Sequence, residues 1–591
     1  MRPEPAAADA TRQPELGLAL SGGGFRAAFF HLGVLARMAE VGLLRRVEVI
    51  STVSGGSIIG AVYYLHVKDL LESRAAADVR DEDYLRIVEH MQKTFLAGVQ
   101  THVRARAYAS LRLNFAMARS DYSRSDRIGD IYGETFYGPT WDRPLFAAEP
   151  APRNREQIEM RELRIQPPGV PADFSPLRAP PREEAPVPIL LVNATSLNSG
   201  HNWRFEAVRM GEDPRTRRRW IEIDKNKRFQ TVRWEQLPPH QQNFELGRAV
   251  AASACVPGLF QPLAVSGLFR YRVPGRGGVH DVRVELVDGG VHDNQGVCGL
   301  IDTECQRMII SDASGQMGDL DEPPTRIPAS VSRATTGVFG DRVREEQLVG
   351  ALQREAVALM HLKKGLQAFV VPPLPAPDAA PVEAEPLDDV DYGVHRAVQE
   401  RLSGVRTDLD SFTEIEAFSL ARFGYAMAEK ELAAPGIREL WRERSLSGTW
   451  DFDAVREVMK RPDEAYLRHL EVSQKRFFKA LALNSRLKMA AVALGILVLA
   501  LVAAGLYFGR AVFSAEVPVT GVLVVAAAIA ALLVLYLKKL KSPRLRGVAE
   551  LVYSTLGPVV AAPGVWAAAR AMLALNGAFV RAGEARRLRD G

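Results

Sequence analysis

The stretch VEVISTVSGGSIIG, residues 47–60, decides the interpretation of this sequence. Its first half is rich in β-branched residues, which predicts a buried strand, and its second half predicts a helix. Ser54 lies between the two and is followed by Gly55 and Gly56. A serine on a sharp strand-to-helix turn with small neighbours presents its hydroxyl for nucleophilic attack. The helix N-terminus behind it favours the negative charge that develops in acyl transfer.

Two features leave the role of this turn open. The usual pattern around such a nucleophile is G-x-S-x-G, and this chain has Thr52 where the first glycine stands. A serine in front of a glycine-rich helix start can also serve only as an N-cap. Ser57 is the better N-cap candidate, which leaves Ser54 free for chemistry. We therefore interpret Ser54 as the nucleophile and expect Thr52, Gly55 and Gly56 to shape its turn.

A glycine-rich loop lies upstream, in LGLALSGGGFRAAFFHLGVL, residues 16–35. A predicted strand runs into Gly22, Gly23 and Gly24, and a predicted helix follows. Consecutive glycines allow neighbouring backbone N–H groups to point together at an anion, and an acyl-transfer enzyme needs such donors for its oxyanion. We expect these three glycines to form the oxyanion hole. Arg26 is expected to support the loop, through a salt bridge, or to meet a lipid phosphate.

The same loop fits a second interpretation, a dinucleotide-binding fingerprint. Gly22, Gly24 and Ala27 match G-x-G-x-x-A, which places a cofactor pyrophosphate at a helix N-terminus. That fingerprint also requires an acidic residue at the end of the next strand, where it binds the ribose. Glu48 falls inside the predicted strand instead of at its end, which disfavours this alternative.

A third turn supplies a candidate base. Residues 284–296 read VELVDGGVHDNQG, so that a predicted strand ends at Asp288, followed by Gly289 and Gly290. A carboxylate there can take the serine proton directly, although an Asp-Gly pair can also serve only to turn the chain. We favour a Ser–Asp dyad over a Ser-His-Asp triad because no histidine has a recognisable triad context. The histidines weighed for a triad are His31, His201, His240, His280 and His292.

Length and composition narrow the classes of protein. The chain has 591 residues, too many for one core when domains hold about 100–200. A net charge of +5 does not by itself indicate nucleic acid. Three cysteines without paired spacing indicate neither a disulfide framework nor a metal site, and they suit a reducing compartment. The N-terminus lacks the apolar run of a secretory signal.

Two apolar runs near the C-terminus predict a membrane anchor. Residues 489–508 and 517–537 carry no charge, and each is long enough to cross a bilayer as a helix, which takes about 20 residues. Their short link makes a transmembrane hairpin, and the basic residues are concentrated in its flanks rather than in its turn. The positive-inside rule then places the large N-terminal part in the cytoplasm. A helical hairpin buried in a soluble core is the alternative.

Composition divides the chain into several parts. The patterns predict α/β structure over 16–66 and again from residue 188, and mainly helices over 392–485. We expect a disordered segment 1–15; a catalytic domain 16–345 with a helical and loop insertion over about 67–187; a mainly helical extension 346–485 with a proline-rich loop 371–391; the hairpin region 486–545; and an apolar and basic tail 546–591.

Several segments, in order, resemble the patatin-like phospholipase family. SGGGFRAAFFHLGVL, VSGGSIIGA and LVDGGVHDNQG are similar to its oxyanion loop, nucleophile elbow and Asp-Gly-Gly block. AVAASACVPGLFQPL, residues 249–263, is similar to its A-S-x-x-x-P-x-x-F-x-P segment, and LLVNATSLNSG resembles the strand before it. The chain departs from many members at Thr52, at Ser21 in place of aspartate, and at Ala27 in place of glycine. The resemblance covers about 16–66 and 186–315.

The resemblance implies a three-layer α/β/α fold and acyl-ester hydrolysis by a Ser–Asp dyad, here Ser54 and Asp288, without a metal or cofactor. The substrate of this chain would be a membrane phospholipid or lysophospholipid. With the predicted hairpin, we expect the chain in the bacterial inner membrane. The partners would be lipid substrate and bilayer, with no nucleic acid, and the oligomeric state is not given. Two other functions remain: a catalytically silent membrane scaffold, and a nucleotide-binding protein that uses the loop Gly22–Gly24.

Overall fold

The computed structural model describes most of the chain before residue 477 and a helical part near its C-terminus. The described residues are 12–110, 122–147, 157–177, 185–212, 226–272, 278–325, 327–366, 390–476, 479–484, 486–490, 493 and 565–588. Residues 1–11 of the segment predicted to be disordered, 1–15, and nearly all of the predicted hairpin, 489–508 and 517–537, lie outside them. Within the described residues, no helix combines the length and the apolar character needed to span a bilayer.

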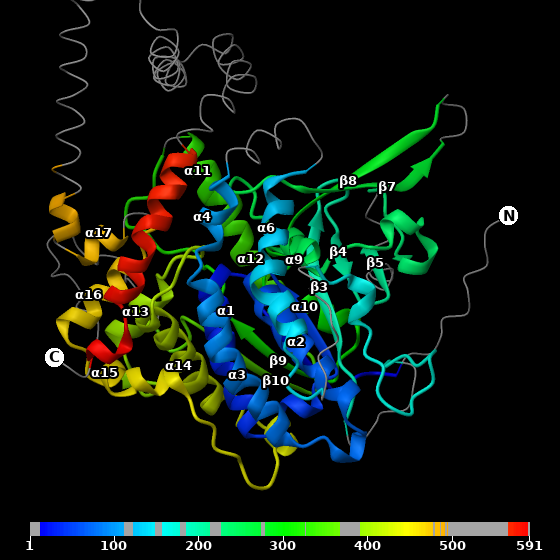
Figure 1. Ribbon diagram of the computed structural model, residues 1–591, viewed down its shortest axis with the longest axis horizontal. Helices are drawn as coiled ribbons and strands as arrows, with labels where there is room; N and C mark the ends of the chain where they lie inside the picture. Colours follow the sequence, from blue (N-terminus) through cyan, green and yellow to red (C-terminus); the bar gives the residue numbers. More distant parts are fainter. Residues whose placement is uncertain are drawn as a thin grey trace, which may run out of the picture.

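A ten-stranded mixed sheet forms the centre of the protein (Figure 1). Its parallel part has the order β10 (Ala356–His361), β9 (Arg307–Asp312), β1 (Leu16–Leu20), β2 (Val49–Val53) and β3 (Ile189–Ser196). Antiparallel pairing adds β4 (Asn202–Phe205), β5 (Arg209–Glu212), β6 (Val232–Arg233) and the hairpin of β7 (Leu263–Tyr271) and β8 (His280–Asp288). The α/β class predicted from the sequence is confirmed.

Helices cover both faces of this sheet, so the core has three layers. Along β1, Leu16, Leu18 and Leu20 pack into the core beneath α1 (Gly24–Glu40) and α2 (Gly55–Ser73), whereas Ala19 packs on the opposite face, beneath α10 (Val297–Asp302) and α12 (Phe339–Ala351). Burial on both faces explains why β1, with the sequence LGLAL, reads as a continuous apolar run instead of an alternating one.

The other α-helices in the described part of the chain lie between strands of the sheet or follow β10 in sequence. They are α3 (Asp81–Val99), α4 (Val103–Tyr108), α6 (Arg124–Tyr132), α7 (Gly138–Asp142), α9 (Leu246–Ala254), α11 (Ile327–Ser332), α13 (Arg396–Ser403), α14 (Glu414–Glu431), α15 (Arg456–Lys460), α16 (Glu464–Ser473), α17 (Lys479–Leu483) and a helix over 565–582.

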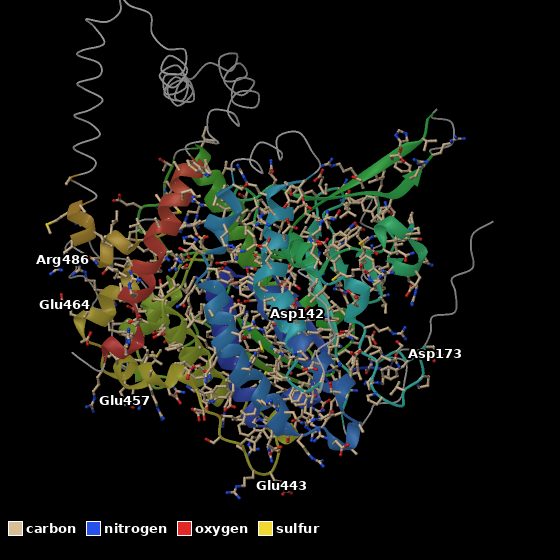
Figure 2. The ribbon with its side chains drawn as sticks, viewed as in Figure 1. Asp142, Asp173, Glu443, Glu457, Glu464 and Arg486 are labelled. Carbon is tan, nitrogen blue, oxygen red and sulfur yellow. The ribbon has the colours of Figure 1, made fainter. Side chains whose placement is uncertain are left out.

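The sheet extends past the domain boundary that we expected at residue 345. β10 pairs in parallel with β9 from Ala356 to His361, so part of the expected extension belongs to the central sheet. The helical remainder packs on the core, where α14 lies beside α1 (Figure 1). Its exposed surface carries charged side chains, among them Glu443, Glu457 and Glu464 (Figure 2), while Asp410 and Glu416 are buried.

Reciprocal glycines let α1 and α14 approach closely. A Cβ on Gly33 would lie 1.8 Å from the carbonyl oxygen of Ala421, and a Cβ on Gly424 would lie 2.1 Å from that of Phe30. Neither backbone can move aside without separating the two helices. The contact therefore fixes the extension to the helix that begins at the glycine-rich loop.

We expect Gly424→Ala to destabilise the protein by about 1–3 kcal/mol or more, because the added methyl forces two packed backbones apart. The matched control is Gly340→Ala in α12, where a Cβ would meet nothing within 4 Å. That substitution should be neutral or stabilise by up to about 1 kcal/mol, because alanine favours helix. Denaturant unfolding of both variants makes the comparison. Equal unfolding midpoints would show that the helices do not depend on the close approach.

Candidate active site

Ser54 occupies the turn between β2 and α2 in a strained backbone conformation. Its φ is 49°, a region that non-glycine residues rarely adopt. Although Ser54 stands at the N-cap position of α2, its side chain makes no capping hydrogen bond. The plain N-cap interpretation of this serine is therefore wrong, and the hydroxyl is left for another role.

A chain of hydroxyls supports the turn from beneath. Thr52 Oγ1 donates to the carbonyl of Leu191 at 3.0 Å and accepts from Ser57 Oγ at 2.9 Å. Ser57 Oγ also pairs with Ser253 Oγ at 2.9 Å, which accepts the backbone N–H of Ser54 at 2.9 Å. Ser57 thus lies inside α2, and our expectation that it caps the helix was wrong.

Two close approaches explain the small residues around Ser54. A Cβ on Gly55 would lie 2.0 Å from the carbonyl oxygen of Gly24, and one on Gly56 would lie 2.2 Å from that of Leu20. The elbow and the glycine-rich loop therefore touch backbone to backbone. The Thr52 methyl, which stands where the usual pattern has glycine, contacts the space left by Gly60, at 2.7 Å from its Cβ position.

The edge of β3 explains how Ser54 and Asp288 meet. β2 pairs with β3 as far as Val53 opposite Asn193, and β8 pairs with the next residues of β3, with Asp288 opposite Ala194. β4 occupies the other edge of β3 at this level. Because one edge is taken, β2 and β8 share the remaining edge and approach each other end to end. Ser54 follows β2 directly, so it faces the last residue of β8.

Asp288 is a buried carboxylate with one oxygen in use. Its Oδ1 accepts the N–H of Gly290 at 2.7 Å, while Oδ2 has no hydrogen-bond partner among the described residues. Burial raises the pKa of Asp288 to about 6, and the Gly290 N–H and the nearby Ser54 hydroxyl only partly oppose that rise. The hydroxyl is thus close enough to affect the carboxyl without a hydrogen bond of ordinary geometry. A carboxylate of raised pKa is a stronger base than an exposed aspartate.

The turn after Asp288 is also shaped by close contacts. A Cβ on Gly289 would lie 2.3 Å from the carbonyl oxygen of Asn193, and one on Gly290 would lie 2.5 Å from Asn294 Oδ1. The same Asn294 oxygen lies 2.3 Å from the Cβ position of Gly22. Asn294 therefore stands between the aspartate turn and the glycine-rich loop.

The glycine-rich loop offers fewer oxyanion donors than the sequence suggested. The N–H of Gly22 donates to the carbonyl of Asn294 at 2.9 Å, so this glycine holds the loop instead of a substrate. Among the described residues, the N–H groups of Gly23, Gly24 and Gly55 have no acceptor. Gly23 and Gly24 have φ values of 131° and 58°, which favour glycine. These three N–H groups are the candidate donors.

Arg26 is a buried clamp and does not reach a lipid phosphate. Arg26 is 3% exposed, and among the described residues its guanidinium donates only to carbonyls, those of Ala313, Ser403 and Val405, at 2.8–3.2 Å. Burial lowers its pKa to about 10. The loop-supporting role stands, through carbonyls in place of the expected salt bridge.

No histidine completes a triad within the described residues. His31 is buried between Ser311 Oγ, at 2.7 Å, and the carbonyl of Ser21, at 3.0 Å. His292 follows the aspartate turn, but its Nδ1 has no hydrogen-bond partner in the described part of the chain, and burial lowers its pKa to about 4. The geometry favours the dyad.

The position of Glu48 weighs against the dinucleotide interpretation. Glu48 precedes β2, and its Oε1 accepts the N–H of Glu15 at 2.7 Å. It therefore lies at the start of the parallel strands, whereas the glycine-rich loop lies at their carboxyl ends. A ribose-binding carboxylate would have to lie at the same end as the loop.

Sequence reasoning missed three residues near the dyad. Ser253 and Asn294 lie in segments whose resemblance was noticed, but nothing in the pattern assigned them a contact. Tyr132 is fully buried, its hydroxyl has no hydrogen-bond partner among the described residues, and both burial and the neighbouring Asp288 raise its pKa. All three contacts join segments far apart in sequence. The described residues contain no group of His, Cys, Asp and Glu placed to hold a metal.

Comparison with known proteins gives a family match that spans these segments. The family model described as patatin-like phospholipase matches residues 18–297, which include both loops and the aspartate turn. No curated protein matches the chain. Among solved structures, VipD from Legionella pneumophila matches at 14% identity over 96% of this chain and 90% of that chain, with a TM-score of 0.24, too low to bear on the fold. By the family match, residues 18–297 of this chain are similar to a patatin-like phospholipase domain.

Proposed function

We propose that this chain is a serine acyl-ester hydrolase of the phospholipase A or lysophospholipase type, with Ser54 as nucleophile and Asp288 as base. The observation that carries the proposal is the end-to-end meeting of a strained serine, which caps no helix, with a buried aspartate that has a free oxygen. The patatin-like phospholipase match supports a lipid acyl ester as the substrate class. The two alternative functions, a membrane scaffold and a nucleotide-binding protein, do not explain why Ser54 and Asp288 lie together.

In the first half of the proposed reaction, Asp288 accepts the Ser54 proton on Oδ2 while Ser54 Oγ attacks the ester carbonyl. The N–H groups of Gly23, Gly24 and Gly55 stabilise the oxyanion, which forms only as the carbonyl becomes tetrahedral. Collapse of this intermediate breaks the ester bond, and the proton on Asp288 passes to the departing alcohol. An acyl group then remains on Ser54.

In the second half, Asp288 takes a proton from water, and the hydroxide attacks the acyl carbonyl with the same donors on the oxyanion. The acid departs as Ser54 recovers its proton from Asp288. No charged partner is needed for Asp288, because burial alone keeps its pKa near the working range of a base.

We propose further that the two apolar runs tether the domain to a bilayer and raise its concentration near lipid. Support comes from the sequence, since 489–508 and 517–537 contain no charge. We expect the full chain in the membrane fraction, and we expect it to stay there after a wash with alkaline carbonate. The double variant Leu497→Arg with Leu501→Arg should be released from the membrane by that wash, because each arginine costs about 2.5–3.5 kcal/mol at the centre of a membrane-spanning helix. Full release of the unmodified chain would contradict the tether.

A fluorophosphonate probe tests the dyad. We expect it to label the wild-type protein at Ser54, as located by peptide mass spectrometry, because the probe reacts with activated serines. Ser54→Ala should abolish the label, and Asp288→Asn should slow it by about 10³-fold or more, since the nucleophile then lacks its base.

Ser330→Ala, which removes a serine far from the dyad in sequence and on another helix, is the control and should label as wild type does. If the folded wild-type protein takes no label, the proposal of a hydrolase is wrong, and a membrane scaffold becomes the favoured function. Bound nucleotide in the purified protein would favour the third function.

The pH dependence of kcat/KM follows from the Asp288 pKa. The base must be ionised, and burial raises its pKa to about 6, so activity should fall about tenfold per pH unit below that value and level off above it. The assay uses an uncharged soluble ester as substrate, so that only groups of the protein titrate. His292→Asn should leave the midpoint unchanged, because this histidine takes no part. A midpoint near that of an exposed aspartate, or one that moves with His292, would contradict the assignment.

A further inference from the structure

The glycine-rich loop is closed from outside by a residue of the extension. The N–H of Phe25 donates to the carbonyl of Asp408 at 3.1 Å. A Cβ on Gly24 would lie 2.7 Å from that same carbonyl oxygen and 2.9 Å from the Asp408 nitrogen. The backbone of Asp408 therefore presses against the two residues that carry or follow the candidate oxyanion donors.

The next residue of the loop reaches the same segment. Arg26 Nη1 donates to the carbonyl of Val405 at 2.8 Å and to that of Ser403 at 3.2 Å. Gly24, Phe25 and Arg26 are thus all held by residues 403–408. This segment lies outside the residues 18–297 matched by the family model.

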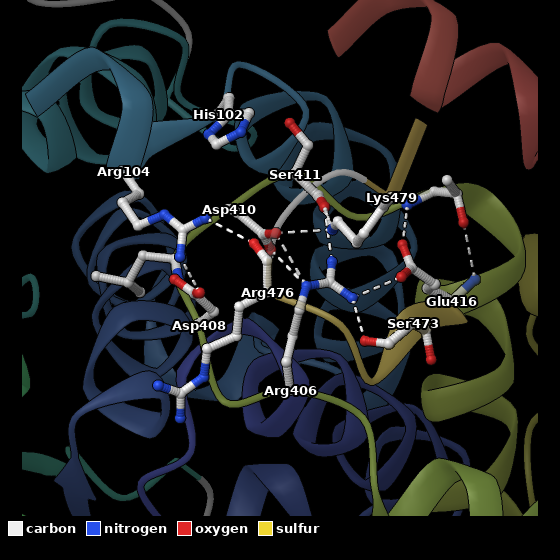
Figure 3. Close-up of polar contacts among 12 residues, drawn as sticks. His102, Arg104, Arg406, Asp408, Asp410, Ser411, Glu416, Ser473, Arg476 and Lys479 are labelled. Carbon is white, nitrogen blue, oxygen red and sulfur yellow. Dashed lines mark hydrogen bonds and ion pairs between the residues drawn. The ribbon is translucent and has the colours of Figure 1, made fainter. Parts of the chain in front are cut away.

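A fully buried arginine holds that segment in shape (Figure 3). Arg406 Nε donates to both carboxylate oxygens of Asp410, at 2.8 and 3.0 Å, and Nη1 donates to Glu416 at 2.6 Å. The same guanidinium donates to the carbonyls of Ser411, at 2.8 Å, and Ser473, at 2.6 Å. All five contacts converge on one side chain that is 0% exposed, so the turn from 405 to 411 has little freedom.

Charge is balanced around this arginine. Lys479 Nζ lies 2.7 Å from Asp410 Oδ2 and donates to the carbonyl of Ser411 at 2.9 Å, so two cations face the two carboxylates of Asp410 and Glu416. Although burial opposes it, the cations Arg406 and Lys479 lower the pKa of Asp410 to about 2. Asp410 therefore stays ionised at every pH at which the proposed base works, whereas burial and the neighbouring Arg406 lower the pKa of Lys479 to about 8.

Asp408 has its own ion pair at the end of the network nearest the loop. Its carboxylate binds the guanidinium of Arg104, and the N–H of Arg104 donates to the carbonyl of Leu409 at 2.9 Å. Arg104 belongs to α4, so a helix of the insertion and a turn of the extension clamp each other beside the loop (Figure 3).

We propose that residues 405–411 position the oxyanion hole, with Asp408 as the residue that holds Gly24 and Phe25 in place. This inference rests on the proposed hydrolase function and adds that the hole is completed from outside the family-matched domain. Asp408 touches no substrate; it acts through the backbone of the loop. Because oxyanion contacts form in the transition state and not with bound substrate, a displaced loop should lower kcat and leave KM unchanged.

The test compares Asp408→Asn with Glu431→Gln. Asp408→Asn keeps the side-chain size but loses the charge that binds Arg104. Glu431→Gln breaks a comparable pair with Lys364, of 2.6 Å, in the same extension and away from the loop. Loss of a whole oxyanion donor costs about 10²–10³ in kcat, and we expect a loosened loop to cost about tenfold.

Kinetics on a soluble ester, at a pH well above the Asp288 pKa, should show that loss in kcat for Asp408→Asn with KM and the pH midpoint unchanged. Glu431→Gln should stay within about twofold of wild type while losing a similar amount of stability. Arg104→Met should reproduce the loss, and Arg104→Lys, which keeps the charge, should restore most of kcat.

Equal kcat in Asp408→Asn and Glu431→Gln, with an active wild type, would overturn the positioning role and leave the hydrolase intact. A rise in KM alone, or a shifted pH midpoint, would also overturn it, since either would place the effect in substrate binding or on the base. A folded wild-type protein without hydrolysis or probe labelling would instead reject the proposed function and this inference with it.

Discussion

The site depends on a shared strand edge. β3 pairs with β2 up to Asn193 and with β8 from Ala194 onward, so two strands that run in opposite directions end against each other. A one-residue change of register would turn each side chain to the opposite face, and would separate the serine from the aspartate. The glycines that follow both residues are consequences of this meeting, because there is no room for side chains where the two strand ends and the first loop converge.

The position of Asp288 beside Ser54 has an energetic cost, because the carboxylate is buried there. Burial raises the Asp288 pKa from 3.8 to about 6, which corresponds to about 3 kcal/mol against its ionised form. A folded-state pKa above the unfolded value means that full stability is present below the unfolded pKa and is lost as the pH rises through about 6. The Arg406 network is the opposite case, since every carboxylate there faces a cation. Asp410 and Glu416 thus face cations that lower their pKa values, whereas no cation among the described residues opposes the rise in the pKa of Asp288.

The local part of the site could be predicted from the sequence, and the tertiary part could not. Gly22–Gly24, Ser54 and Asp288 stand at strand ends marked by β-branched runs and glycine pairs, which are short-range signals. The bond from Gly22 to Asn294, the hydroxyl of Ser253 and the place of Ser57 inside α2 depend on segments that meet only in the folded chain. The expected domain boundary at residue 345 excluded β10 for the same reason, because the sequence of one strand does not show which strand it pairs with.

These contacts change what counts as the catalytic unit. Residues 18–297 contain the serine, the aspartate and the glycine-rich loop, yet they omit β9, which pairs with the whole length of β1. They also omit Ala313 and Val405, whose carbonyls hold Arg26, and α14, against which α1 packs through Gly33 and Gly424. Without them β1 would be an open edge strand, and the helix that begins at the oxyanion loop would lose its outer neighbour. The unit that can hold the oxyanion donors in place therefore extends to the end of the network around Arg406.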